Sequence, residues 1–144
     1  VIEEGRALVL ALNKWDLSKK QSLEEVRYLL EKSLAQVRGV PVVPLSAKTG
    51  KNIDKLMTTI QQMYDLWNVR IPTGILNRWL QEAITRHPLP LVKGRRLRIK
   101  YITQVKYRPP TIAMFASKPE ELPESYTRYL ISSLRENFQI PGVP

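Results

Sequence analysis

The chain has 144 residues and a net charge of +10. Its 43% hydrophobic and 25% charged residues exclude a disordered chain, and the absence of cysteine excludes disulfides and thiolate metal sites. It has one histidine, and no apolar run approaches the roughly 20 residues that cross a bilayer. We therefore predict no metal site and no membrane partner. No signal peptide opens the chain, and we expect a cytoplasmic protein.

The first half of the chain alternates short apolar runs with amphipathic stretches. Residues 7–12, ALVLAL, predict a strand buried on both faces of a parallel sheet. Ser22, followed three residues later by Glu25, predicts a capping box at the start of a helix. Residues 40–45 predict a second strand, and Asn52 is predicted to cap a second helix. This order is typical of a doubly wound α/β sheet, in which ligands bind at the carboxyl ends of the strands.

The second half predicts an α-β-β-α order. Thr73 is predicted to cap its first helix. Residues 95–103, RRLRIKYIT, alternate between apolar and basic side chains, which indicates a strand, and residues 111–117 indicate a second one. Tyr101 and Phe115 are expected to be buried under the helices, although exposed aromatic rings on these strands would be able to stack on bases.

The positive charge is concentrated in the second half. Residues 1–67 have a net charge of +2 and residues 68–144 one of +8, and eight basic and no acidic residues lie between Arg86 and Arg108. Such clustering indicates an anionic partner, with nucleic acid as the first candidate; a solvated strand face or a domain contact is the alternative. The candidate RNA contacts are Arg95, Arg96, Arg98, Lys100, Lys106 and Arg108.

A polar motif, Asn13-Lys14-Trp15-Asp16, follows the first apolar run. The carboxylate of Asp16 is suited to accept both the ring N–H and the exocyclic amine of guanine, a donor pair that adenine lacks. Asn13 is placed to donate to the other base edge and to brace the neighbouring loops. The aliphatic part of Lys14 is suited to lie over the purine ring.

A second polar motif, Ser46-Ala47-Lys48, follows the second apolar run. The small side chain of Ala47 would let its backbone N–H approach the guanine carbonyl oxygen. Lys48 is suited to cover the sugar, and Ser46 to tie this loop to Asp16. The two motifs together predict a guanine site, whereas each alone is also compatible with an ordinary polar loop.

The stretches ALVLALNKWD, VPVVPLSAKTGKNIDKL, IPTGILNRWLQEAI, GRRLRIKYITQVKYRPPTIAMFAS and LPESYTRYLISSLRENF resemble the Der/EngA tandem GTPase family. That family has two GTPase domains in series, followed by a KH-like domain. The resemblance implies that residues 1–67 are the C-terminal part of the second GTPase domain, with a P-loop GTPase-type doubly wound sheet. It implies that residues 68–144 form the KH-like α+β domain, with its last strand missing.

The resemblance also implies a function. The family hydrolyses GTP in the cytoplasm, binds GTP or GDP with Mg²⁺, and acts on ribosomal RNA in assembly of the large ribosomal subunit. The partners implied are that subunit and the missing N-terminal GTPase domains of the same chain. Guanine contacts are implied for Asn13, Lys14, Trp15 and Asp16, and for the Ser46-Ala47-Lys48 motif.

This sequence departs from the family pattern in its phosphate-binding parts. It contains no G-x-x-x-x-G-K-[ST] loop, no switch segment and no magnesium ligand, so we assign no catalytic residue and expect no hydrolysis by the fragment. It also lacks the G-x-x-G loop of ordinary KH domains. Two alternatives stay open: a non-catalytic RNA-binding module with vestigial nucleotide motifs, and an Era-type GTPase with one GTPase domain and a KH domain.

Overall fold

The computed structural model describes residues 1–18, 22–34, 38–92 and 94–144. They form two compact units: residues 1–68 together with 140–144 make up unit 1, and residues 69–139 make up unit 2. We predicted a boundary between residues 67 and 68, with the last five residues in the second domain. The structure groups those five residues with unit 1 instead.

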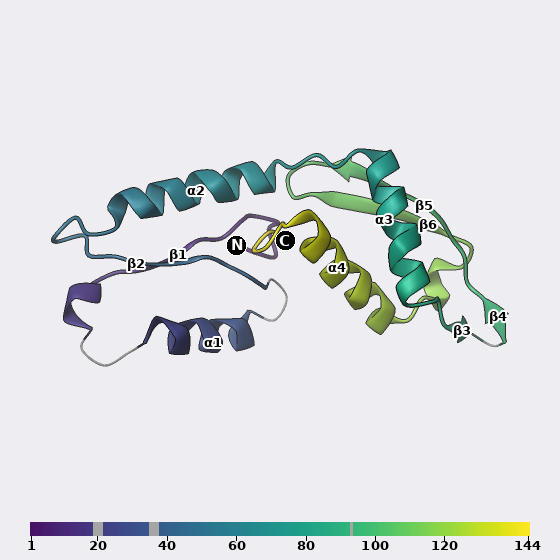
Figure 1. Ribbon diagram of the computed structural model, residues 1–144, viewed down its shortest axis with the longest axis horizontal. Helices are drawn as coiled ribbons and strands as arrows, with labels where there is room; N and C mark the ends of the chain where they lie inside the picture. Colours follow the sequence, from purple (N-terminus) through teal and green to yellow (C-terminus); the bar gives the residue numbers. More distant parts are fainter. Residues whose placement is uncertain (19–21, 35–37, 93) are drawn as a thin grey trace. The chain divides into compact units, whose positions relative to one another are not determined.

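Unit 1 is a small α/β unit built around a two-stranded parallel sheet. Its two strands pair in register, with Leu10 opposite Val42 and Leu12 opposite Pro44. The two long helices flank this sheet on opposite sides (Figure 1), which confirms the predicted α/β class. The elements are β1 (Leu10–Leu12), the 3₁₀ helix η1 (Trp15–Leu17), α1 (Leu23–Ser33), β2 (Val42–Pro44) and α2 (Ile53–Trp67).

The strands of unit 1 are shorter than predicted. We expected residues 7–12 to form a strand buried on both faces, but β1 covers three residues and Ala11 in its centre is exposed. In the part of the chain that the structure describes, β1 pairs with β2 alone, so it extends only where β2 supplies ladder partners. The better-covered strand is β2, in which Val42 and Val43 are 8% and 2% exposed.

The two predicted helix caps of unit 1 have different outcomes. The capping box is confirmed, because the Glu25 N–H donates to Ser22 Oγ at 3.1 Å and the Ser22 N–H donates to Glu25 Oε2 at 3.3 Å. Asn52 occupies the predicted N-cap position of α2, but its side chain forms no cap bond there. Asn52 takes a left-handed backbone conformation with φ 62°, and its amide Nδ2 donates to the Pro44 carbonyl at 2.7 Å. Its side chain therefore holds the end of β2 and not the start of α2.

The last five residues complete the core of unit 1. Ile140 and Val143 are 5% and 2% exposed, and the Gly142 N–H donates to the Arg38 carbonyl at 2.8 Å. Gly142 has φ +71°, and a Cβ atom there would lie 3.0 Å from the Gly39 carbonyl oxygen. Both the left-handed backbone and the close approach therefore favour glycine at this position.

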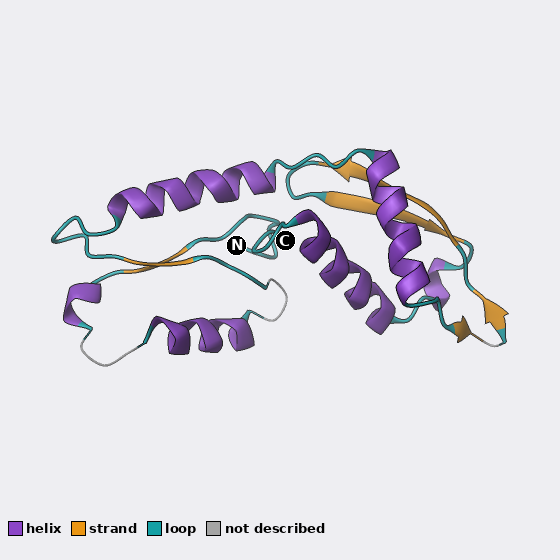
Figure 2. Cartoon of the chain, viewed as in Figure 1, coloured by secondary structure: helices purple, strands orange, loops and turns teal. Residues whose placement is uncertain are grey.

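Unit 2 has two helices that pack against a two-stranded antiparallel hairpin (Figure 2). The hairpin consists of β5 and β6, and the helices α3 and α4 enclose a shared apolar core with its inner face. The predicted α-β-β-α order is present, with an additional short hairpin of β3 and β4. The elements are α3 (Thr73–Arg86), β3 (Leu91–Val92), β4 (Arg95–Arg96), β5 (Ile99–Lys106), β6 (Thr111–Ala116), the 3₁₀ helix η2 (Pro119–Glu121) and α4 (Glu124–Phe138).

The strand predicted at residues 95–103 is divided in two. Its first two residues pair with β3, and β5 starts only at Ile99. A register shift between Ile99 and Tyr101 then reverses the alternation, so Ile102 is buried at 3% exposed. Tyr101 and Phe115, which we expected under the helices, are 44% and 43% exposed, and that prediction is wrong. A β-bulge of this kind shifts the side chains that directly follow it to the opposite face.

The start of α3 also differs from the prediction. Pro72 and not Thr73 occupies the N-cap position, and no side-chain cap bond is formed there. The Thr73 hydroxyl instead bonds to the Thr103 hydroxyl of β5 at 2.9 Å. Asn77, one turn further along, exchanges two bonds with the backbone of Ile102, at 2.8 Å and 3.0 Å. These contacts fix α3 to β5.

Candidate functional site

The two polar motifs of unit 1 lie together at the carboxyl ends of β1 and β2. Backbone pairing continues past the strands, because the Leu45 N–H donates to the Leu12 carbonyl at 2.9 Å and the Trp15 N–H donates to the Leu45 carbonyl at 3.0 Å. Parallel strands end at one edge of their sheet, so the loops that follow them are brought side by side.

Asn13 links the two motifs directly. Its side-chain Oδ1 accepts the backbone N–H of Lys14 at 2.8 Å and that of Ala47 at 3.0 Å. The loop-bracing role predicted for Asn13 is therefore confirmed. The N–H of Ala47, which we expected to point at a guanine carbonyl, is engaged by Asn13 in this structure. A bound carbonyl oxygen would have to share that N–H with Asn13 or replace it.

Ser46 shapes the second loop from inside. It is 1% exposed, its Oγ accepts the Thr49 N–H at 3.3 Å, and its carbonyl accepts the Gly50 N–H at 2.9 Å. The predicted tie from Ser46 to Asp16 is not formed in this structure; the Ser46 bonds found among the described residues stay within its own loop. A hydroxyl this deeply buried needs a nearby partner, and the turn supplies one in the Thr49 N–H.

The side chains predicted to read the base lie at the surface of this edge. Asp16 in η1, Lys14 and Lys48 are exposed, and Trp15 is partly buried. Lys14 takes a left-handed conformation with φ 60° just before η1. An exposed carboxylate beside a braced loop can accept two parallel N–H donors, which is the chemistry that guanine offers. The individual base contacts remain predictions.

Asn52 has a second role beside the N-cap position, which the sequence pattern does not predict. The hydrogen bond from its side-chain amide to the Pro44 carbonyl fixes the end of β2. The backbone bridge between Ser46 and Lys51 closes the loop that separates Pro44 from Asn52. After glycine, Asn is among the residues that most readily adopt the left-handed conformation, and this tendency indicates a loop role for Asn52. An Asn before an amphipathic stretch predicts a side-chain cap instead.

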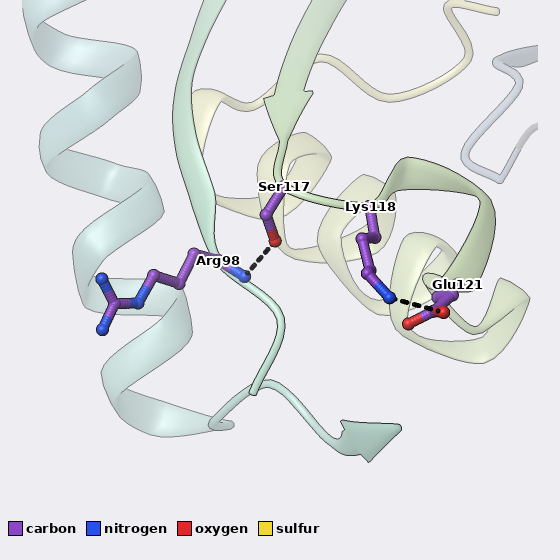
Figure 3. A network of polar contacts seen from close by, with 4 residues as sticks. All are labelled: Arg98, Ser117, Lys118 and Glu121. Carbon is purple, nitrogen blue, oxygen red and sulfur yellow. Dashed lines mark hydrogen bonds and ion pairs between the residues drawn. The ribbon is translucent and has the colours of Figure 1, made fainter. Parts of the chain in front are cut away.

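The basic candidates of unit 2 lie along its small hairpins. Arg98 is held through its backbone: its N–H donates to Ser117 Oγ at 3.2 Å, and its carbonyl accepts the Ser117 N–H at 2.8 Å. Its guanidinium points away from Ser117 (Figure 3), while Lys118 pairs with Glu121 at 3.0 Å. Of Arg96 only the backbone is described, as part of β4. The other exposed candidates are Arg95, Lys100, Lys106 and Arg108.

Neither a metal cluster nor a membrane-spanning helix is found in the part of the chain that the structure describes. Within residues 1–18, 22–34, 38–92 and 94–144, no three His, Asp or Glu side chains lie close enough together to hold a metal ion. Among these same residues, none of the helices combines the length and apolar character that crossing a bilayer requires.

Residues 70–144 match the family described as "KH-domain-like of EngA bacterial GTPase enzymes, C-terminal". The match covers more than half of the chain. The chain belongs to the Der/EngA family. This membership confirms the resemblance found in the sequence and decides against the Era-type alternative. Unit 2, with its two helices on one face of a hairpin, supplies most of the matched region.

Der/EngA relatives also match unit 1. The chain is 50% identical over 146 residues to "GTPase Der" of Parvibaculum lavamentivorans, with 100% of this chain and 31% of the relative covered. It is 54% identical over 144 residues to "GTPase Der" of Azorhizobium caulinodans, with 100% and 32% covered. For "GTPase Der" of Mesorhizobium japonicum the identity is 51% over 146 residues, with 100% and 30% covered. The chain thus spans about a third of the length of these curated relatives.

Proposed function

We propose that this chain contributes guanine recognition and a basic RNA-contacting domain to a GTP-hydrolysing factor that assembles the large ribosomal subunit in the cytoplasm. The observation that carries the guanine part is the Asn13 brace, which holds the two specificity motifs at one sheet edge. The names of the relatives, "GTPase Der", support the same activity.

The residues present fit the base end of a guanine nucleotide. The carboxylate of Asp16 would accept the ring N–H and the amine, each such charge-assisted bond contributing about 1.5–3 kcal/mol. Lys14 and Lys48, both exposed beside it, would cover the ring and the sugar. The ligand would be GTP before hydrolysis and GDP after it.

The phosphate end of the nucleotide would be held by other parts of the whole protein. The sequence contains no G-x-x-x-x-G-K-[ST] loop, and a Mg²⁺ ion would therefore act through residues outside this chain. When bound, that ion would neutralise charge on the phosphates during hydrolysis. The partners proposed within the same protein are its N-terminal GTPase domains.

The second part of the proposal concerns ribosomal RNA. Unit 2 carries no acidic residue between Glu82 and Glu120, a segment that contains β3, β4, β5 and β6. Arg98, Lys100 and Lys106 are exposed there and would contact backbone phosphates. Phosphate contacts give affinity that falls steeply with salt concentration, which a binding titration can measure.

The guanine assignment is tested by Asp16→Asn in the full-length protein that carries this chain. An amide cannot accept both guanine donors, but it can donate to the C2 carbonyl of xanthine. We expect GTP affinity at this domain to fall by about 100-fold or more, since at least one charge-assisted bond is lost and a donor faces a donor. The affinity for xanthosine triphosphate should rise.

The control for this test is Asp54→Asn, which makes the same change at an exposed position in the first turn of α2. With two GTPase domains in the whole protein, tightly bound GDP should fall from about two to about one per chain in Asp16→Asn only. Unchanged GDP stoichiometry together with unchanged guanine selectivity would show that Asp16 does not read the base.

A further inference from the structure

The outer face of the β5–β6 hairpin carries an exposed aromatic pair. Tyr101 and Phe115 lie opposite each other in the ladder, with ring centroids 4.3 Å apart and ring planes 9° from parallel. The side chains that pack into the core of unit 2 come from other hairpin positions, such as Ile102 and Met114. One face of each ring is therefore stacked on its partner, while Tyr101 remains 44% exposed and Phe115 43% exposed.

The charges around this pair have one sign. Lys100, at the register shift directly before Tyr101, and Arg98 lie at one end of β5, and Lys106 lies at the other. At a rise of about 3.3 Å per residue, Lys106 is roughly 17 Å along the strand from Tyr101. Glu121, drawn with Arg98 in Figure 3, lies beside Lys118 and is paired with it at 3.0 Å.

We propose that Tyr101 and Phe115 form a platform on which unpaired bases of an RNA strand stack, while the basic residues at the two ends of β5 hold the flanking phosphates. Base stacking on exposed aromatic rings combined with a basic track is the way in which proteins hold single strands without reading their sequence. The inference rests on the proposed RNA function and adds to it the part of the RNA that is recognised, namely bases and not only phosphates.

The charge pattern favours an RNA strand over a protein as the occupant. An aromatic pair that served a protein interface would be expected without lysine neighbours such as Lys100, because lysine is depleted from such interfaces whereas arginine is enriched in them. Here every charged residue from Arg86 to Arg108 is basic. The pair also stabilises the hairpin as a cross-strand contact by roughly 0.2–1 kcal/mol, so a test must separate binding from stability.

The experiment measures the affinity of the chain for labelled 12-nucleotide RNA probes by fluorescence anisotropy. The three probes are single-stranded oligoadenylate, an abasic strand of the same length, and oligoadenylate duplexed with oligouridylate. The wild type should bind single-stranded oligoadenylate about 5- to 150-fold more tightly than the abasic strand, the range expected for stacking of one base. Tyr101→Leu and Phe115→Leu should reduce that ratio to near one without changing the salt dependence. The duplex, whose bases are already stacked, should bind the wild type and the two hairpin variants equally well.

The matched control is Tyr28→Leu, which removes a 59% exposed tyrosine from α1 in unit 1. It should bind as the wild type does. A second comparison, Lys100→Gln, should lower the salt dependence and leave the preference for bases intact. Thermal melting of each variant confirms that it is folded.

The outcomes separate this inference from the function on which it rests. If the wild type binds RNA and loses affinity in Lys100→Gln, but Tyr101→Leu and Phe115→Leu keep the preference for bases, the stacking platform is refuted and RNA contact stands. If the wild type binds none of the strands, both are refuted. A preference for bases that is lost in the two hairpin variants and kept in Tyr28→Leu establishes the platform.

Discussion

Substitution of Asn13 by alanine should loosen the guanine edge of unit 1 without removing any base-reading carboxylate. One side-chain oxygen of Asn13 accepts two backbone N–H groups, one in its own loop and one in the loop after β2. A hydrogen bond of this kind contributes about 0.5–1.5 kcal/mol net. Because Asn13 is exposed, we take the lower half of that range, which gives about 1–2 kcal/mol for the two bonds together.

Asn13→Asp is the matched comparison. Its carboxylate keeps an acceptor for both N–H groups and removes only the amide donor that would reach the base. Native-state amide exchange followed by NMR reads the two bonds separately from the rest of the chain. We expect the Ala47 amide to exchange about 5-fold faster in Asn13→Ala, equivalent to about 1 kcal/mol, and close to the wild-type rate in Asn13→Asp.

Two results would contradict this reasoning. If Ala47 exchanges at the wild-type rate in Asn13→Ala, Asn13 does not brace the loops in solution. If Asn13→Asp accelerates exchange as much as Asn13→Ala does, the link depends on the amide nitrogen and not on Oδ1. The expected result is a third one: Asn13→Asp keeps the loops in place and still weakens nucleotide binding in the full-length protein, because the amide donor to the base is lost.

Three further predictions concern contacts in unit 1 and the phosphate-binding parts that this sequence lacks. Ser22→Ala removes the capping box and should lower the stability of α1 by about 1 kcal/mol in urea unfolding; Glu24→Gln, in the same turn but outside the box, should have a smaller effect. Gly142→Ala should lower the melting temperature more than Gly50→Ala. Both glycines have a positive φ, but only at position 142 would the added methyl group lie 3.0 Å from the Gly39 carbonyl oxygen. Equal losses in the two variants would mean that the close approach is relieved without strain. The isolated chain should bind GDP too weakly for calorimetry at micromolar concentrations and should not hydrolyse GTP, and a micromolar dissociation constant would overturn that expectation.

The parts of the fold that were predictable depend on neighbours in sequence or on strand topology. Ser22 and Glu25 are three residues apart, so their reciprocal bonds follow from helix geometry alone. Asn13 and Ala47 are 34 positions apart, yet each follows a strand, and parallel strands end together. The carboxyl-edge location of both motifs was therefore available from the sequence.

The parts that were missed depend on partners that the sequence does not reveal locally. The exposure of Tyr101 results from a register shift, and that shift is decided by how β5 pairs with β6. A strict alternation from Ile99 onward assigns Tyr101 to the wrong face. Asn52 was likewise assigned by its position before a helix, whereas its conformation is set by the carbonyl of Pro44 across the loop.

The bond between Gly142 and Arg38 has a consequence for the order in which the protein folds. It joins segments roughly a hundred residues apart, and the whole of unit 2 lies between them in the chain. Closing so long a loop is entropically unfavourable and slow compared with the local contacts of unit 2. During synthesis, unit 2 can therefore be fully folded before unit 1, although most of unit 1 is made first. Unit 1 completes its core only when residues 140–144 have been added.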